Sequence, residues 1–109
     1  MPENKYSDQT DSDVEVEFDV PPQYKVVLFN DDYTTMEFVV EILMVDFNKT
    51  FEEASAVMLE VHKSGKGIAG IYPYDIAATK ARSAQNKARA AGFPLQITVE
   101  EDCWNYLKN

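Results

Sequence analysis

The pattern of apolar and polar positions after residue 22 predicts strands that alternate with helices. Residues 24–29 form a β-branched and aromatic run that stops at Asn30-Asp31-Asp32, residue types that favour turns. Residues 95–100 alternate strictly between apolar and polar, and residues 67–72 are an apolar run that stops at Pro73. We therefore expect three strands.

Three further segments have the spacing of helices. Thr34 and Glu37 have the spacing of a capping box, in which the Thr34 hydroxyl accepts a backbone N–H and Glu37 reaches back. Thr50 and Glu53 repeat this spacing before a second helix, which Gly65 would end in a left-handed conformation. A third helix would run from residue 74 to residue 91 and end at Gly92.

Each predicted helix carries one stripe of apolar or small residues. The stripe of the first helix is Val39, Ile42, Leu43 and Phe47. The stripe of the second is Phe51, Ala54, Val57, Met58 and Val61. The stripe of the third is Ala77, Ala81, Ala84, Ala88 and Ala91, whose small side chains suit close packing on a sheet.

The predicted fold class is α+β, in the order β-α-α-β-α-β. We expect a two-layer sandwich in which three helices cover one face of a three-stranded antiparallel sheet. Residues 1–22 are read as a flexible acidic extension, 23–102 as the core and 103–109 as a C-terminal tail without an assigned role. Residues 14–18 alternate and leave a solvated edge strand open as an alternative.

Composition limits the classes of function. The chain has 109 residues, with 10 Lys and Arg against 19 Asp and Glu and a net charge of -9, so we expect neither nucleic acid nor membrane as a partner. A single cysteine, Cys103, excludes an internal disulfide and a multi-cysteine zinc site. With no apolar run long enough for a membrane span and no secretory signal, we expect a cytoplasmic protein, and we expect a monomer.

The polar candidates for chemistry are Asn30, Asp31, Asp32 and the only histidine, His62. An antiparallel pair of helices would bring the end of the second helix back to the start of the first, so His62 and Asp32 would be neighbours beside apolar residues. Carboxylate, amide oxygen and imidazole next to an apolar wall suit an ammonium group that adjoins a hydrophobic side chain, as in a protein N-terminus. Spacing alone leaves ordinary roles open, because these residues also form turns, helix caps and core.

Other chemistry has weaker support in the sequence. Asn30–Thr35 lacks the alternating acids of a calcium loop, Gly65-Lys66-Gly67 is too short for a phosphate loop, and Cys103 lies in a polar tail far from His62. A small metal-dependent or acid-base enzyme that uses Asp31, Asp32 and His62 is the alternative function.

The segments Tyr24–Thr34, Met36–Val39, Val61-His62 and Gly65-Lys66 resemble the ClpS family of adaptors. The resemblance covers about residues 22–101 and includes Asp75, Thr79-Lys80 and Pro94-Leu95. ClpS-like adaptors bind substrates that begin with Leu, Phe, Tyr or Trp and pass them to the AAA+ unfoldase ClpA or ClpC for degradation by ClpP. The resemblance therefore implies an adaptor that is not an enzyme and needs no cofactor or metal.

The resemblance also implies roles for individual residues. The residues that contact the α-amino group of the substrate in the family correspond to Asn30, Asp32 and His62 in this sequence, with Asp31 and Thr34 nearby. The hydrophobic pocket falls on Leu28, Met36, Val39, Met58, Val61 and Leu95. The unfoldase contact falls on Asp75, Thr79 and Lys80, and the extension 1–20 would act in delivery rather than recognition. A third hypothesis keeps the fold but makes the chain a regulator of the unfoldase that binds no degron.

Overall fold

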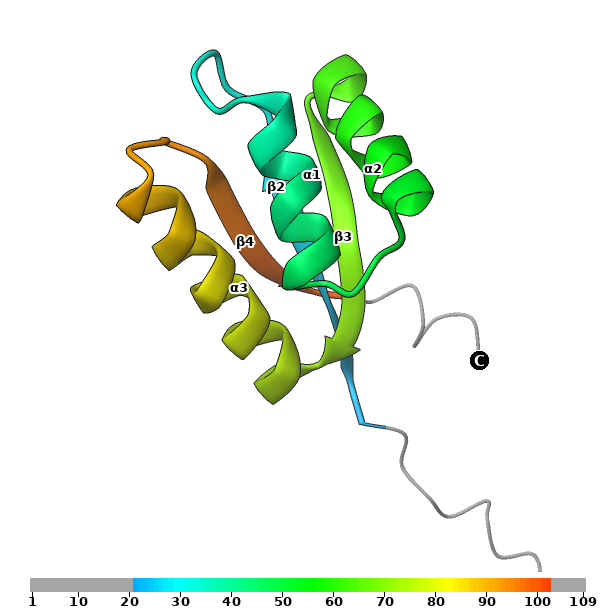
Figure 1. Ribbon diagram of the computed structural model, residues 1–109. Coiled ribbons are helices and arrows are strands. Elements are labelled where there is room, and N and C mark those ends of the chain that lie inside the picture. Colours follow the sequence, from blue (N-terminus) through cyan, green and yellow to red (C-terminus); the bar gives the residue numbers. More distant parts are fainter. Residues whose placement is uncertain (1–20, 103–109) are drawn as a thin grey trace, which may run out of the picture.

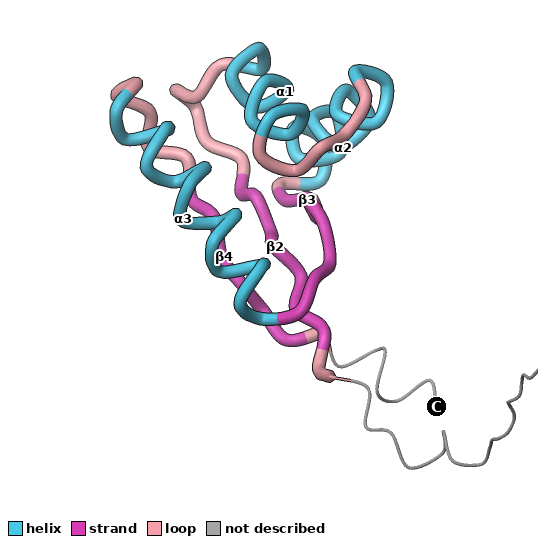
Figure 2. Tube along the Cα trace, turned by 60° about the horizontal axis from the view of Figure 1, so that its bottom comes forward, coloured by secondary structure: helices cyan, strands magenta, loops and turns pink. Residues whose placement is uncertain are grey.

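Within residues 21–102 an antiparallel sheet forms one layer, and the three helices of this part of the chain pack on one of its faces (Figures 1 and 2). The computed structural model describes residues 21–102, so the expectations for residues 1–20, for the alternative strand 14–18 and for the tail 103–109 lie outside the described residues. The elements are β2 (Gln23–Phe29), α1 (Met36–Val45), α2 (Phe51–Ser64), β3 (Lys66–Pro73), α3 (Tyr74–Ala90) and β4 (Gln96–Glu101). The predicted fold class and element order are confirmed.

Strand β2 is central, with β3 on one side and β4 on the other. Both pairings are antiparallel, so the end of β2 lies beside the start of β3, where Phe29 pairs with Lys66 and Leu28 with Gly67. Because α2 directly precedes β3, this register also places the C-terminal end of α2 beside the turn that follows β2.

Helix α2 begins and ends as its sequence predicts. The Thr50 hydroxyl accepts the Glu53 N–H at 3.1 Å, and the Glu53 carboxylate accepts the Thr50 N–H at 2.9 Å, which completes a capping box. At the other end, Gly65 has φ 92°, a left-handed conformation that costs glycine little. Local sequence therefore fixes both ends of this helix.

The capping box predicted for α1 at Thr34 is wrong. The N-cap is Thr35, whose hydroxyl accepts the Phe38 N–H at 3.1 Å. Thr34 instead donates its hydroxyl to Asp31, and this bond holds it in the preceding turn. With Thr35 as the cap, the third helical residue is Phe38, which has no carboxylate to complete a box.

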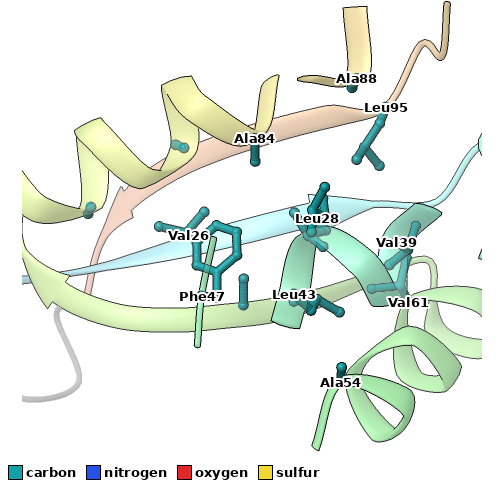
Figure 3. Close-up of a cluster of buried hydrophobic side chains, with 14 residues drawn as sticks. Val26, Leu28, Val39, Leu43, Phe47, Ala54, Val61, Ala84, Ala88 and Leu95 are labelled. Atoms are coloured by element: carbon teal, nitrogen blue, oxygen red, sulfur yellow. The ribbon is translucent and has the colours of Figure 1, made fainter. Parts of the chain in front are cut away.

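A single apolar core lies between the helices and the sheet (Figure 3). The apolar residues that line it are buried almost completely and come from every helix and from all three strands or their ends. They are Val26, Leu28, Val39, Ile42, Leu43, Phe47, Ala54, Val61, Ala69, Ala77, Ala81, Ala84, Ala88 and Leu95. In the part of the chain that the structure describes, no helix has the length and hydropathy needed to cross a bilayer.

Two of the predicted stripe residues do not reach this core. Phe51 is 61% exposed because it is the first residue of α2, at the outer end of the helix pair. Ala91 is exposed because it caps α3 and lies beyond its last turn. Phe47 lies beyond the end of α1 but is buried, and its ring centroid is 6.5 Å from that of Tyr72.

Replacement of Thr50 tests the capping box of α2. Thr50→Ala removes the acceptor for the Glu53 N–H, so we expect the free energy of unfolding to fall by about 1 kcal/mol. Thr50→Ser keeps the hydroxyl and should retain most of that stability in urea denaturation. Equal losses in the two variants would contradict the role of the hydroxyl.

Candidate functional site

The polar turn after β2 is tied directly to the end of α2. The Asn30 N–H donates to the Gly65 carbonyl oxygen at 2.9 Å and extends the pairing of β2 with β3 by one residue. Gly65 follows His62 by three positions, so this bond holds the turn and the histidine close together. The predicted meeting of Asp32 and His62 is confirmed, since both line the same cavity.

This cavity has a volume of about 470 Å³ and lies between the turn, the start of α1 and the end of α2. Of the residues that the sequence marked as a site, nine line it: Asn30, Asp31, Asp32, Thr34, Met36, Val39, Met58, Val61 and His62. Sequence reasoning missed Tyr33, Thr35 and Glu37, which also line it. Their place between predicted site residues was the only signal that could have found them.

Asp31 lines the cavity, but its carboxylate oxygens are already bonded within the turn. One carboxylate oxygen accepts the N–H groups of Tyr33 and Thr34, each at 2.7 Å, and the other accepts the Thr34 hydroxyl at 2.7 Å. Burial raises the pKa of Asp31, but these bonds outweigh the burial, and the pKa of the carboxyl lies below its ordinary value. Asp31 is therefore ionised at neutral pH, and both of its carboxylate oxygens already accept hydrogen bonds from the turn.

Three acceptors remain for a ligand. The side chains of Asn30, Asp32 and His62 are exposed, and within residues 21–102 none of them takes part in a hydrogen bond or ion pair. An α-ammonium group has three N–H donors, and an amide oxygen, a carboxylate and a neutral imidazole nitrogen supply three acceptors. The chemistry of these three lining residues suits such a cation.

The cavity also has an apolar part of its lining. Val39 and Val61 are buried, Met58 is half-buried, and Met36 is 43% exposed. Met36 is the first residue of α1 and lines the cavity beside the turn, where its flexible thioether can adapt to a ligand. An apolar group attached to the cation would therefore contact methionine and valine side chains.

Two residues expected in the hydrophobic pocket are core residues that do not line the cavity, and their role in binding stays a prediction. Leu28 and Leu95 are almost fully buried between the sheet and the helices and do not line the cavity (Figure 3). The physical reason is that Leu28 is on the central strand, on the face that the helices cover, and Leu95 packs against the same layer. The sequence could not distinguish a leucine of the core from one of the pocket.

The residues expected to contact an unfoldase lie on α3, away from the cavity. Asp75 and Thr79 are exposed. Lys80 is half-buried, and its ammonium group donates to the Asp46 carbonyl oxygen at 2.9 Å and to Asn48 Oδ1 at 3.1 Å. Lys80 thus fastens the connection between α1 and α2 to α3.

The geometry of the cavity gives little support to the alternative hypothesis of an acid-base or metal-dependent enzyme. A general acid or base works best with a pKa near the working pH, whereas the pKa of Asp31 is shifted downward. Among residues 21–102, no group of three or more His, Cys, Asp or Glu side chains is placed to hold a metal ion.

Comparison with known proteins identifies close relatives. A family model described as "ATP-dependent Clp protease adaptor protein ClpS" matches residues 19–98. The ClpS adapter of Wolinella succinogenes is 58% identical over 81 residues, which are 74% of this chain and 79% of that protein. The ClpS adapter of Desulforapulum autotrophicum is 52% identical over 94 residues, which are 86% of this chain and 90% of that protein.

A solved structure shares both the fold and the sequence. It is Agrobacterium tumefaciens ClpS2 bound to L-phenylalaninamide, which is 40% identical and has a TM-score of 0.73. The match covers 76% of this chain and all of that one. The ligand in that structure combines a free amino group with a benzyl side chain.

The role of Asp31 in the turn predicts a pH dependence of stability. Because its folded pKa is depressed, Asp31 stabilises the fold above its unfolded pKa, about 3.9, and this contribution is lost as the pH falls through the folded value. We therefore expect Asp31→Ala to melt below the wild type at pH 7, by a margin that shrinks in acid.

Asp31→Asn provides the matched control, because it keeps an acceptor for the turn but does not titrate. Its melting temperature relative to Asp31→Ala should stay constant with pH. The wild type should instead fall toward the asparagine variant as its carboxyl is protonated in acid, because the neutral carboxyl is then an uncharged acceptor like the amide. A margin between wild type and Asp31→Ala that does not change with pH would contradict the assignment.

Proposed function

The chain belongs to the ClpS family of ATP-dependent Clp protease adaptor proteins, and on this basis we propose that it is an adaptor for N-terminal degrons. It binds substrates whose first residue is Leu, Phe, Tyr or Trp and delivers them to an AAA+ unfoldase of the ClpA or ClpC type, for degradation by ClpP. The adaptor itself carries out no chemistry.

The cavity between the turn and the two helices is the observation that carries this proposal. Among its lining residues, Asn30, Asp32 and His62 are offered to the α-amino group, and Met36, Met58 and the two valines to the first side chain. Its volume of about 470 Å³ is in the range of pockets that enclose small ligands. The ligand of the Agrobacterium ClpS2 structure has both chemical features.

Both halves of the ligand are needed for useful affinity. Burial of a Leu or Phe side chain is worth roughly 1.5 to 3 kcal/mol, and a hydrogen bond to a charged group is worth a similar amount. An internal Phe has no ammonium group, and an acetylated terminus has lost its charge and two of its donors. Each therefore keeps only one of the two contributions and should bind poorly.

The partner surface is proposed on α3. Asp75 and Thr79 are exposed near its first turns and can contact the unfoldase directly. Lys80 supports this surface because it holds the connection between α1 and α2 against α3, and its ammonium group can also contact the unfoldase directly. Because this surface lies away from the cavity, the adaptor can hold a substrate and an unfoldase at the same time, as a monomer.

The proposal is tested by fluorescence anisotropy with labelled peptides that differ only in their first residue. We expect a peptide that begins with Phe to bind in the micromolar range, and its acetylated copy to show no binding. His62→Ala should weaken the binding of Phe by about 1 to 3 kcal/mol, since one acceptor for the ammonium group is lost.

The melting temperature of His62→Ala separates binding from folding. His62 is exposed on the last turn of α2, so the variant should melt close to the wild type. Weaker binding that came with an equally large loss of thermal stability would assign His62 to the fold instead. Tight binding of the acetylated peptide would overturn the proposed function.

Met36 is expected to select among first residues. Its side chain can pack on a Leu, which is not branched at Cβ, or on a flat aromatic ring, but it clashes with the second carbon on the Cβ of Ile or Val. We therefore expect Met36→Ala to admit peptides that begin with Ile or Val, which the wild type rejects, while retaining Phe. Rejection of Ile and Val by the variant, in the same anisotropy assay, would remove Met36 from this role.

A further inference from the structure

A second hollow lies beside the cavity, between α1 and α2, and none of the roles above uses it. It is a groove of about 620 Å³, and its walls are mostly apolar. The residues that matter for its shape are Met36, Val40, Met44, Val45, Phe51 and Met58. The two helices that form it are neighbours in Figure 1.

The groove is continuous with the proposed degron cavity. Met36, Glu37 and Met58 line both hollows, so a chain that leaves the cavity over Met36 enters the groove. Such continuity is what a polypeptide ligand requires, because only its first residue is held in the cavity and the rest must cross the surface.

The far end of the groove exposes more apolar surface than folding requires. Val45 is 59% exposed and Phe51 is 61% exposed, and neither belongs to the buried core. Adjacent apolar side chains left open in this way commonly mark a surface that another chain covers.

The length of the groove defines which part of a substrate can reach this end. From Met36 to Val45 a helix rises about 14 Å, at about 1.5 Å per residue. An extended chain spans that distance with about four residues, at about 3.4 Å each. With the first residue in the cavity, residues at about positions four to six reach Val45 and Phe51.

The charges beside the groove add a second preference. Glu37 and Glu41 are exposed, lie one turn apart on α1 and both line the groove. They carry no ion pair within the described residues, so they favour lysine or arginine in the passing chain and disfavour acidic residues.

We propose that this groove binds the substrate segment that follows the first residue, and that it takes an apolar side chain at about the fourth to sixth position. The inference rests on the proposed function and deepens it, since it gives the degron a second determinant beyond the terminal residue. A substrate with a suitable first residue but a polar segment behind it binds more weakly.

Two peptides and three proteins test the groove. The peptides are Phe-Ser-Gly-Leu-Leu-Lys and Phe-Ser-Gly-Ser-Ser-Lys, and L-phenylalaninamide serves as a ligand that fills the cavity alone. The proteins are the wild type, the double variant Val45→Ser with Phe51→Ser, and the control double variant Ile71→Ser with Ile76→Ser. The control residues are 45% and 47% exposed and lie outside the groove.

We expect the wild type and the control variant to bind the leucine peptide about threefold to tenfold more tightly than the serine peptide, because partly exposed apolar side chains become buried. The groove variant should lose this preference, while all three proteins bind L-phenylalaninamide equally. Equal affinity of the wild type for the two peptides would overturn the groove but leave the degron cavity intact.

Two other results separate the remaining explanations. If the wild type fails to bind L-phenylalaninamide, the proposed function itself is wrong. If the groove variant keeps the preference for the leucine peptide but loses affinity for the unfoldase, the groove is an unfoldase contact and the inference is overturned.

Discussion

The antiparallel pairing of β2 with β3 is the constraint on which the site depends. It brings the end of β2 beside the start of β3, and the bond from the Asn30 N–H to the Gly65 carbonyl oxygen carries that pairing into the turn. Since α2 leads directly into β3, its last turn and His62 are held at the same edge. A polar turn and a histidine 30 positions apart thereby become two walls of one cavity.

A close approach between α2 and β3 gives this edge its shape. A Cβ atom on Gly67 would lie 2.8 Å from Val61 Cγ2 and 3.4 Å from the Val57 carbonyl oxygen, so the absent side chain lets the helix lie against the strand. Val61 and Met58 then line the cavity from the helix side, while Gly67 is buried against Val61. The absence of a side chain at Gly67 therefore allows α2 to approach β3 closely enough for Val61 to take its place in the cavity wall.

Binding and folding are divided among neighbouring residues of the turn. Asp31 and Thr34 satisfy one another and the local backbone, whereas Asn30 and Asp32 on either side keep exposed polar groups. This division fixes the backbone of the turn while leaving the polar side chains of Asn30 and Asp32 open to solvent.

The sequence by itself determined both ends of α2, because the capping box of Thr50 and Glu53 and the left-handed Gly65 act on backbone groups within a few residues. The alternation of residues 95–100 also predicted a strand, which the structure has at Gln96–Glu101. The start of α1 was also decided locally, because the Thr34 hydroxyl donates to Asp31 three positions earlier and leaves Thr35 as the cap, but the sequence offered both threonines. Only the tertiary structure decided that Leu28 is buried in the core while Met36 stays partly exposed, because burial depends on which residues from other elements pack against a side chain.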